Sequence, residues 1–360
     1  EHKMIKKECF TAEWIEQVSS ELHYNDKNLI EKVIRALSLL EMLVKAGCPL
    51  VFKGGTALML ILGKSAHRLS IDIDLICPPG TNIEDYLKSF ADFGFINLEL
   101  VERKQRDDAD IPKSHSKFFY QIAYRNDTDA QSYILLDVLY EDIHYFRTQQ
   151  IAINCPFIRL EGKPLMVTVP SAEDILGDKL TAFAPNTTGI PYYRNGRSCS
   201  MEIAKQLYDV GRLFENVSDL QITKEAFRKI AVVELSYRSF GTDIGQVFND
   251  IRQTALCIST RGKAGEGDFD LIQDGIIRVK SFMYKQRYLI DHAIIDAARA
   301  AYLATLIEKG INEIESYSNN PADIKDMVIR PSLPNKLNKL RSNLPEAYYY
   351  WAKTSELLEA

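Results

Sequence analysis

The 360-residue sequence predicts a mixed β-sheet with flanking helices, followed by a mainly α-helical C-terminal domain. The chain is long enough for two domains of ordinary size. Strand-like and helix-like runs alternate as far as the segment PLMVTVP, as is typical of one sheet with helices packed on it. Beyond that segment almost every apolar pattern repeats at helical spacing. We therefore expect a domain of residues 1–168, which includes N-terminal helices, and a helical domain of residues 169–360.

The first domain is predicted to begin with helices and to continue into strands. Residues 28–46 repeat apolar side chains at helical spacing, and Asp26 or Asn28 can cap that helix. Residues 82–94, NIEDYLKSFADFG, have the pattern of an amphipathic helix that ends at Gly94. The runs predicted as strands are CPLVF, SIDIDLIC, FINLELVE, KFFYQIAY and SYILLDVLYE. A short apolar helix, TALMLIL, separates the first two strands.

The second domain is predicted to consist of helices joined by loops. One long helical run covers roughly residues 269–309. The other predicted helices are SAEDILGDKLTAF, MEIAKQLYDVGRLFE, TKEAFRKIAVVEL, TDIGQVFNDIRQTALCI and PEAYYYWAKTSELLEA. Residues 184–200 form a long loop in which Arg194 and Arg197 either reach phosphate or are ordinary solvated side chains. The basic segment 329–341 is either an RNA-backbone patch or a solvated face.

Composition and charge narrow the class of protein. A hydrophobic fraction of 46% and a charged fraction of 26% are typical of a globular protein with a sizeable core. The net charge of −5 argues against a generally basic nucleic-acid binder, although a local basic groove is compatible with it. Six scattered cysteines without a C-x-x-C pair indicate reduced thiols rather than a disulfide framework or a zinc site. Because the sequence has no apolar run of about 18 residues and no signal-peptide core, we expect a cytoplasmic protein without a membrane segment.

Residues 51–77, VFKGGTALMLILGKSAHRLSIDIDLIC, hold most of the candidate chemistry. The GKS at 63–65 is interpreted as a helix C-cap and turn, because the apolar run before it does not have the glycine spacing of a phosphate-binding P-loop. Gly54, Gly55 and Thr56 lie between a predicted strand and a predicted helix. Glycine there lets backbone N–H groups approach a phosphate, and the helix N-terminus adds partial positive charge. A tight strand-to-helix turn is the plain alternative.

Two aspartates follow the turn on a predicted strand. Asp72 and Asp74 project from one face, about 7 Å apart along the chain, so they repel each other and raise each other's pKa. A pair of divalent metal ions would neutralise both and could assist an in-line phosphoryl displacement. A solvent-facing polar edge is the alternative. The same D-x-D pattern at Asp268 and Asp270, in GDFDL, is better explained as N-capping of a helix.

A third carboxylate lies on a later strand. Asp137 stands among apolar residues in SYILLDVLYE, which has the pattern of a central strand buried on both faces. A buried carboxylate needs a basic partner or a metal, or it is forced to protonate. Beside the strand of Asp72 and Asp74 it would complete a three-carboxylate metal site, and it would suit a base that deprotonates an attacking hydroxyl. A structural salt bridge is the alternative.

Three segments together resemble a known family. FKGGTAL, HRLSIDIDL and AEDILGDKLTAF resemble the AbiEii/AbiGii nucleotidyltransferase toxins, including MenT-type enzymes, within the DNA polymerase beta-like nucleotidyltransferase superfamily. The resemblance covers about Val51 to Phe214, and its G-G-T…R-x-S-x-D-[IL]-D-L combination is specific. It implies an α/β nucleotidyltransferase fold and a toxin of a bacterial toxin–antitoxin or phage-defence (abortive infection) system.

The resemblance also implies ligands and partners. Gly54, Gly55 and Thr56 would hold a nucleoside triphosphate, and Asp72 and Asp74 would bind Mg²⁺ or Mn²⁺. Characterised relatives transfer nucleotides to the 3′ end of tRNA, so tRNA and a cognate antitoxin protein are the expected partners.

Further residues are assigned by the same resemblance. Lys179, in GDKLTAF, matches a family lysine that would contact the triphosphate. Asp209 matches the last aspartate of the family motif R-D-x-Y-D-[LI], which is KQLYDV in this chain, so Lys-Gln replaces the Arg-Asp pair. Arg68 and Ser70 either brace the metal-binding strand, or Arg68 pairs with the acids.

The expected activity is a two-metal transfer of a nucleotide from a nucleoside triphosphate to an acceptor hydroxyl. The acceptor suggested by the resemblance is the tRNA 3′ end, and a protein side chain or a small molecule such as an antibiotic is the alternative. A non-catalytic nucleotide-binding protein is a third hypothesis. The clustered acids argue against that third hypothesis, because a pure binder of nucleotides has no need of them.

Overall fold

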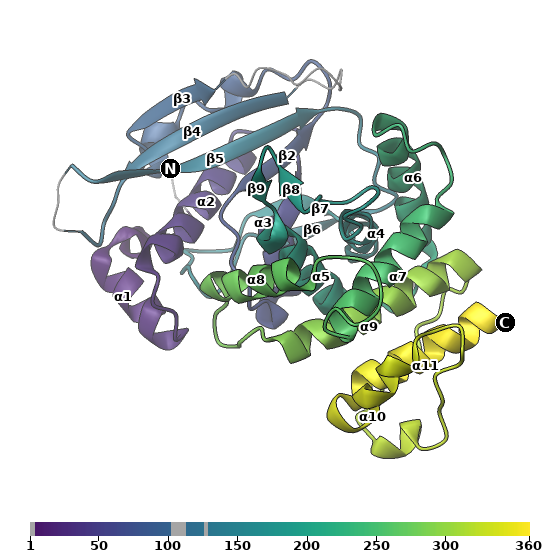
Figure 1. The fold of residues 1–360 in the computed structure, drawn as a ribbon. Coiled ribbons are helices and arrows are strands. Elements are labelled where there is room, and N and C mark those ends of the chain that lie inside the picture. The colour runs from purple at the N-terminus through teal and green to yellow at the C-terminus, as the bar shows by residue number, and fades with distance from the viewer. Residues whose placement is uncertain (1–3, 102–112, 126–128) are drawn as a thin grey trace. The chain divides into compact units, whose positions relative to one another are not determined.

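The structure, a computed structural model, describes residues 4–101, 113–125 and 129–360 (Figure 1). The chain divides into two compact units. The α/β unit comprises Glu1–Ser171 and Ser281–Gln286, and the helical unit comprises Ala172–Lys280 and Arg287–Ala360.

The α/β unit is built on a five-stranded sheet of order β1-β2-β5-β4-β3. Its strands are β1 (Val51–Lys53), β2 (Ile73–Cys77), β3 (Asn97–Val101), β4 (Lys113–Gln121) and β5 (Gln131–Tyr140). The β2–β5 pair is parallel and the other three pairs are antiparallel, so the predicted mixed sheet is confirmed. The predicted short helix is also confirmed, as α3 (Gly54–Leu62), which directly follows β1.

One face of the sheet is buried against a long helix. Helix α2 (Lys27–Lys45) packs against β5 (Figure 1). Its Arg35 guanidinium lies 4.9 Å from the ring centroid of the buried Tyr120 on β4. Along β5 the buried residues alternate with half-buried ones, and Asp137 belongs to the half-buried set. The expectation that this strand is buried on both faces is therefore wrong, because β5 pairs with β4 as an antiparallel hairpin that has only one core face.

Other elements complete the α/β unit. They are α1 (Ala12–Glu21) and a two-stranded sheet of β6 (Thr148–Ala152) and β7 (Met166–Pro170). The helix predicted for residues 82–94 is wrong: two 3₁₀ turns, Ile83–Tyr86 and Phe90–Phe93, occupy this segment and end at Gly94 with a φ of +90°. The Ser38 hydroxyl of α2 donates a hydrogen bond to the carbonyl of Phe93. This contact with α2 competes with the regular hydrogen-bond ladder of an α-helix.

The helical unit contains the helices expected from residue 171 onward. Its helices are α4 (Ala172–Ala182), α5 (Ser200–Phe214), α6 (Gln221–Tyr237), α7 (Gly245–Ser259), α8 (Phe269–Val279), α9 (Ile290–Lys309), α10 (Leu340–Asn343) and α11 (Pro345–Glu359). Helix α9 is buried along most of its length and packs against α7, α11 and α5. The predicted loop 184–200 contains a small hairpin of β8 (Tyr193–Arg194) and β9 (Arg197–Ser198).

The single helical run expected for residues 269–309 is interrupted. Helices α8 and α9 are separate, and Ser281–Gln286 between them belongs to the α/β unit. We call these six residues the return segment. The N–H of Leu69 donates to Phe282 O (2.7 Å) and the N–H of Tyr284 donates to the carbonyl of His67 (2.9 Å), so the return segment pairs with the chain just before β2.

Two further expectations concern the whole chain. The six cysteines, all in the described part of the chain, are free thiols, as predicted. None of the helices formed by the described residues is long and apolar enough to cross a membrane.

Candidate active site

The turn between β1 and α3 brings the backbone against an aspartate. Gly54 has a φ of +84°, which L side chains rarely adopt, and a Cβ at this position would overlap the Asp74 carboxylate. A Cβ on Gly55 would lie 2.7 Å from Ser70 Oγ and 3.2 Å from Arg68 Nη2. Close approach therefore favours glycine at both positions, and the first N–H groups of α3 begin beside Asp74.

Thr56 holds the chain that leads into β2. Its side chain is fully buried, and its hydroxyl lies 2.7 Å from the carbonyl oxygen of Asp72 and 3.0 Å from Ser70 Oγ. A hydroxyl has one proton, so Thr56 donates to the Asp72 carbonyl and accepts from Ser70. In this arrangement Thr56 and Ser70 fix the backbone that carries Asp72.

Arg68 is part of the same support. Its side chain is buried, and its Nη1 donates to the carbonyl of Leu69 at 3.2 Å. Arg68 also forms an isolated β-bridge with Met283, so backbone pairing joins the segment before β2 to the return segment. Bracing of the strand, one of the two roles considered for Arg68, fits the contact with Leu69.

Charged side chains form a row across four strands. Lys53 of β1 is the register partner of Asp74, Asp74 is the partner of Asp137 on β5, and Asp137 is the partner of His115 on β4. Register partners point to the same face of a sheet, and neighbouring strands lie about 4.8 Å apart. The two carboxylates are therefore neighbours, with a lysine on one side and a histidine on the other. We call these four residues the charged row.

His115 contacts Asp137 directly and was not selected from the sequence. Its Nδ1 is hydrogen-bonded to Asp137 Oδ1, with the imidazole 12% and the carboxylate 30% exposed. A signal was available: the turn-rich segment RNDTDA joins the two strand-like runs, and an antiparallel hairpin of these runs brings His115 close to Asp137. Sequence reasoning treated these strands one at a time and missed the pair.

The donor chemistry of this site fits a hard divalent cation. Carboxylate oxygens are the ligands that Mg²⁺ and Mn²⁺ prefer, and Asp74 and Asp137 lie side by side on one face. Asp72 is exposed and directly precedes β2. Within the described residues no group of three or more His, Cys, Asp or Glu side chains lies close enough to hold a metal ion. The fit therefore rests on neighbouring carboxylates rather than on an assembled three-carboxylate cage.

Lys179 and Asp209 lie together in the helical unit. Lys179 Nζ on α4 is 3.0 Å from Asp209 Oδ2 on α5, and both side chains are almost completely buried. Of the two residues that depart from the family motif, Lys205 pairs with Glu202 at 3.3 Å. The resemblance thus selected two residues that are far apart in sequence and in contact in the fold.

Helix α5 also carries a second buried ion pair, formed by residues that were not predicted to belong to the site. Arg212 Nη2 lies 2.9 Å from the carboxylate of Asp296, which is fully buried on α9. Burial raises the pKa of Asp296, and the neighbouring guanidinium groups of Arg212 and Arg299 act against that rise. The contact of Lys179 with Asp209 therefore does not by itself identify a catalytic pair.

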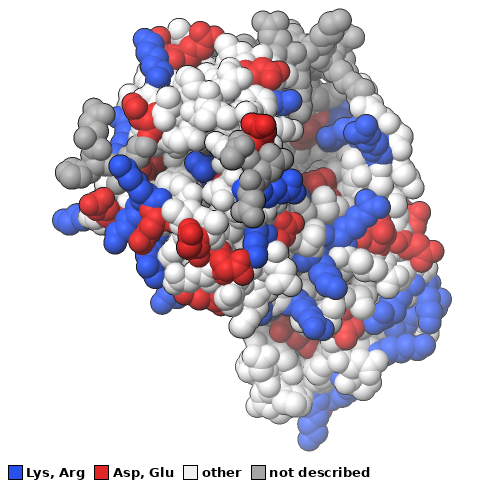
Figure 2. All heavy atoms as spheres, turned by 90° about the vertical axis from the view of Figure 1, so that its left-hand side faces the viewer, with Lys and Arg blue, Asp and Glu red and all other residues white. Residues whose placement is uncertain are grey.

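The basic residues noted in other segments lie on the surface of the helical unit. Arg194 and Arg197 are exposed register partners on the β8–β9 hairpin. In the segment 329–341, Lys336 donates to the carbonyl of Lys263 at 2.9 Å, and its basic side chains are exposed. Lys and Arg are interspersed with Asp and Glu on the face drawn in Figure 2, so that face carries no continuous basic surface among its described residues.

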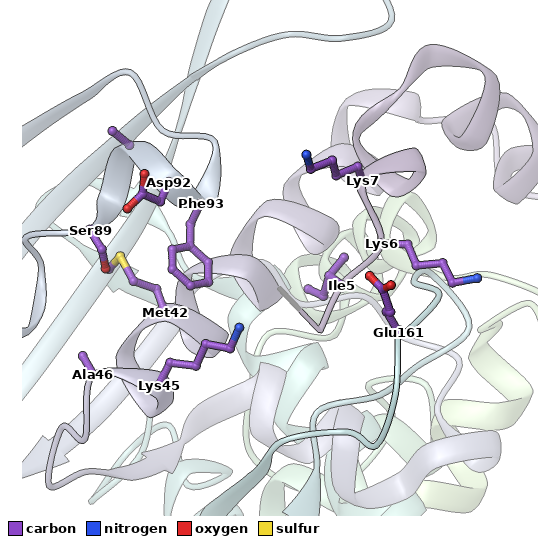
Figure 3. A pocket seen from close by; sticks show the side chains of 11 residues that line it. Ile5, Lys6, Lys7, Met42, Lys45, Ala46, Ser89, Asp92, Phe93 and Glu161 are labelled. Carbon is purple, nitrogen blue, oxygen red and sulfur yellow. The ribbon is translucent and has the colours of Figure 1, made fainter. Parts of the chain in front are cut away.

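A cavity of about 1170 Å³ in the α/β unit lies apart from these residues (Figure 3). It is lined by the N-terminal segment, the end of α2 and the second 3₁₀ turn, and the Lys45 ammonium lies 5.7 Å from the Phe93 ring centroid. None of the predicted site residues lines it. The cavity therefore does not serve as evidence for the candidate site.

The comparisons with known proteins identify the family. The family model described as nucleotidyl transferase AbiEii toxin, type IV toxin–antitoxin system, matches residues 37–322, which is most of the chain. The chain belongs to the AbiEii nucleotidyltransferase toxin family. The match includes the G-G-T turn, the charged row, Lys179 and Asp209.

Solved structures similar to this AbiEii family member include two from Helicobacter pylori. One is JHP933 (17% identity, 78% of this chain and 94% of that chain covered, TM-score 0.41). The other is a putative nucleotidyltransferase (17% identity, 78% and 94% covered, TM-score 0.40). A third is MenT4, a nucleotidyltransferase toxin from Mycobacterium tuberculosis H37Rv (12% identity, 95% and 99% covered, TM-score 0.41). A search of curated proteins found no match.

Proposed function

We propose that this AbiEii toxin transfers a nucleotide from a nucleoside triphosphate to the 3′ hydroxyl of tRNA, with two divalent cations held by Asp72, Asp74 and Asp137. The observation that carries the proposal is the charged row beside the Gly54–Gly55 turn. It places two neighbouring carboxylates next to the N-terminus of α3, where phosphate oxygens are favoured. Membership of a nucleotidyltransferase toxin family supports the reaction class.

The reaction assigns one role to each part of the site. The acceptor oxygen forms a bond to the α-phosphorus while the bond from that phosphorus to the bridging α–β oxygen breaks, and pyrophosphate leaves with the electron pair. Asp137 takes the proton of the attacking hydroxyl. Mg²⁺ or Mn²⁺, when bound, supplies neutralisation of the negative charge on the phosphate oxygens.

The remaining site residues position these groups. The N–H groups of Gly55 and Thr56 at the start of α3 bind the triphosphate, and the Thr56 hydroxyl, Ser70 and Arg68 hold the chain that carries Asp72. The family resemblance assigns the Lys179 ammonium to the triphosphate, and the ion pair with Asp209 would hold that ammonium in place.

The experiment that tests the site is transfer of α-labelled nucleotide by the Asp74→Asn variant. We expect the rate to fall at least about a hundredfold, because a neutral amide cannot replace a carboxylate in neutralising a cation. Asp268→Asn is the matched control: the same substitution in the D-x-D that caps α8, where the Asp268 side chain accepts from the N–H of Leu271. Asn is also a good N-cap, so this control should transfer normally.

Thermal unfolding of both variants shows whether the fold is kept. Transfer by folded Asp74→Asn at the wild-type rate would refute the assigned role of the charged row.

The acceptor is tested with the four labelled nucleotides and three acceptors. We expect label on intact tRNA and none on tRNA whose 3′ ribose has been oxidised with periodate, which destroys the attacking hydroxyl. Cell protein is the third acceptor. Label on protein with none on RNA would rule out the tRNA acceptor while leaving the reaction class intact.

A further inference from the structure

We infer that His115 is a positioning residue that orients the Asp137 carboxylate for cation binding and proton transfer. This inference rests on the proposed function, because it assigns a role within the same site. The observation behind it is the direct hydrogen bond from His115 Nδ1 to Asp137 Oδ1 at the centre of the α/β unit's sheet.

The strand register places the imidazole where it can act on a single oxygen. His115 and Asp137 are directly opposite in the β4–β5 ladder, on the face that the core does not cover. On the other side of Asp137, the parallel neighbour is Asp74. The Asp137 carboxylate therefore has a fixed donor on one flank and a second carboxylate on the other.

Asp137 is not a fully buried carboxylate that depends on a partner for all of its solvation. A carboxylate that is 30% exposed keeps part of its hydration without a protein partner. The consequence of the contact is orientational. An N–H bound to Oδ1 restricts rotation of the carboxylate about its side-chain bonds and leaves Oδ2 for another ligand.

Such an arrangement is typical of residues that support cation ligands. Carboxylate ligands are themselves commonly hydrogen-bonded, and loss of the supporting group costs about 10–100-fold in metal affinity or activity. Without the imidazole, the Asp137 carboxylate is free to rotate away from the adjacent Asp74. Removal of His115 is therefore expected to weaken cation binding rather than only to lower stability.

The two substitutions that test this role differ in whether they keep a hydrogen-bond donor near the position of His115 Nδ1. His115→Asn places an amide nitrogen near the position of Nδ1 and can keep the hydrogen bond, whereas His115→Leu removes it. Phe119→Leu is the control, because Phe119 lies on the same face of β4, packs 5.6 Å from the Tyr133 ring centroid and is paired with Tyr133 rather than Asp137. It perturbs strand packing without touching the carboxylate.

The readouts are the dissociation constant for Mn²⁺ alone, measured on the full chain by electron paramagnetic resonance, the kcat and KM of transfer, and the melting temperature. His115→Leu should raise the Mn²⁺ dissociation constant about 10–100-fold and lower kcat by a similar factor, with KM for the nucleotide within about twofold. His115→Asn should recover Mn²⁺ binding to within about threefold of wild type. Phe119→Leu should change the melting temperature only.

The possible results separate the role of His115 from the proposed function. Unchanged Mn²⁺ binding in His115→Leu, or no saturable Mn²⁺ binding by the wild-type chain, would overturn the role of His115. Equal losses in the Leu and Asn variants would also overturn it, because the retained donor would then have no effect. A His115-dependent Mn²⁺ affinity in a chain that transfers no nucleotide would support the inference and refute the proposed function instead.

Discussion

Gly54 sets how closely the β1–α3 turn approaches Asp74. Its positive φ and the space taken by the Asp74 carboxylate are two separate reasons for glycine at this position. Gly47 has the same kind of backbone, with a φ of +77°, but a Cβ there would meet nothing within 4 Å. The pair therefore separates backbone strain from displacement of the carboxylate.

We predict that Gly47→Ala lowers the free energy of unfolding by about 1–2 kcal/mol and leaves transfer unchanged. Gly54→Ala should show the same strain and, in addition, a fall in transfer of about a hundredfold, because it moves Asp74. Urea unfolding and the labelled-nucleotide assay measure the two effects. Equal activity in the two variants would show that the contact between Gly54 and Asp74 has no part in catalysis.

At the scale of elements, the ion pair of Lys179 and Asp209 joins α4 to α5. Because both side chains are almost completely buried, Lys179→Met removes the cation that faces the buried Asp209 carboxylate, which we predict lowers the free energy of unfolding of the helical unit by about 3–5 kcal/mol. The double variant Lys179→Met/Asp209→Asn removes the charge and should regain most of that loss. Chemical denaturation followed by far-ultraviolet circular dichroism measures both.

Transfer by the same two variants distinguishes a structural pair from a functional one. If the double variant regains stability but not transfer, Lys179 acts on the substrate. Recovery of both would make the pair structural.

Local patterns in the sequence predicted the elements well. Alternation identified β2, strand-like apolar runs identified β4 and β5, and the glycine pair with its following apolar run identified α3. The patterns did not reveal His115, because its role depends on which strand lies beside β5 and in which register. The two 3₁₀ turns of residues 82–94 were mistaken for a helix for a related reason: their contact with α2 is tertiary.

At the scale of the whole molecule, the chain returns to its first unit late in the sequence. The return segment interrupts what the sequence predicts as one helical run over residues 269–309. Its backbone bonds to His67 and Leu69 support the loop that carries Arg68 and leads to Asp72. The paired residues are more than two hundred positions apart, and local sequence patterns do not predict backbone pairing over such a distance.

The central claim, that the charged row and its glycine turn catalyse nucleotidyl transfer, is tested most directly by the position of the label in the substrate. The wild-type chain is incubated with tRNA, Mg²⁺ and a nucleoside triphosphate labelled in parallel reactions at the α- or the γ-phosphate. The account predicts that the α-label enters tRNA while the γ-label is released as pyrophosphate. Incorporation of the γ-label, or no incorporation of either label with any of the four nucleotides, would contradict it.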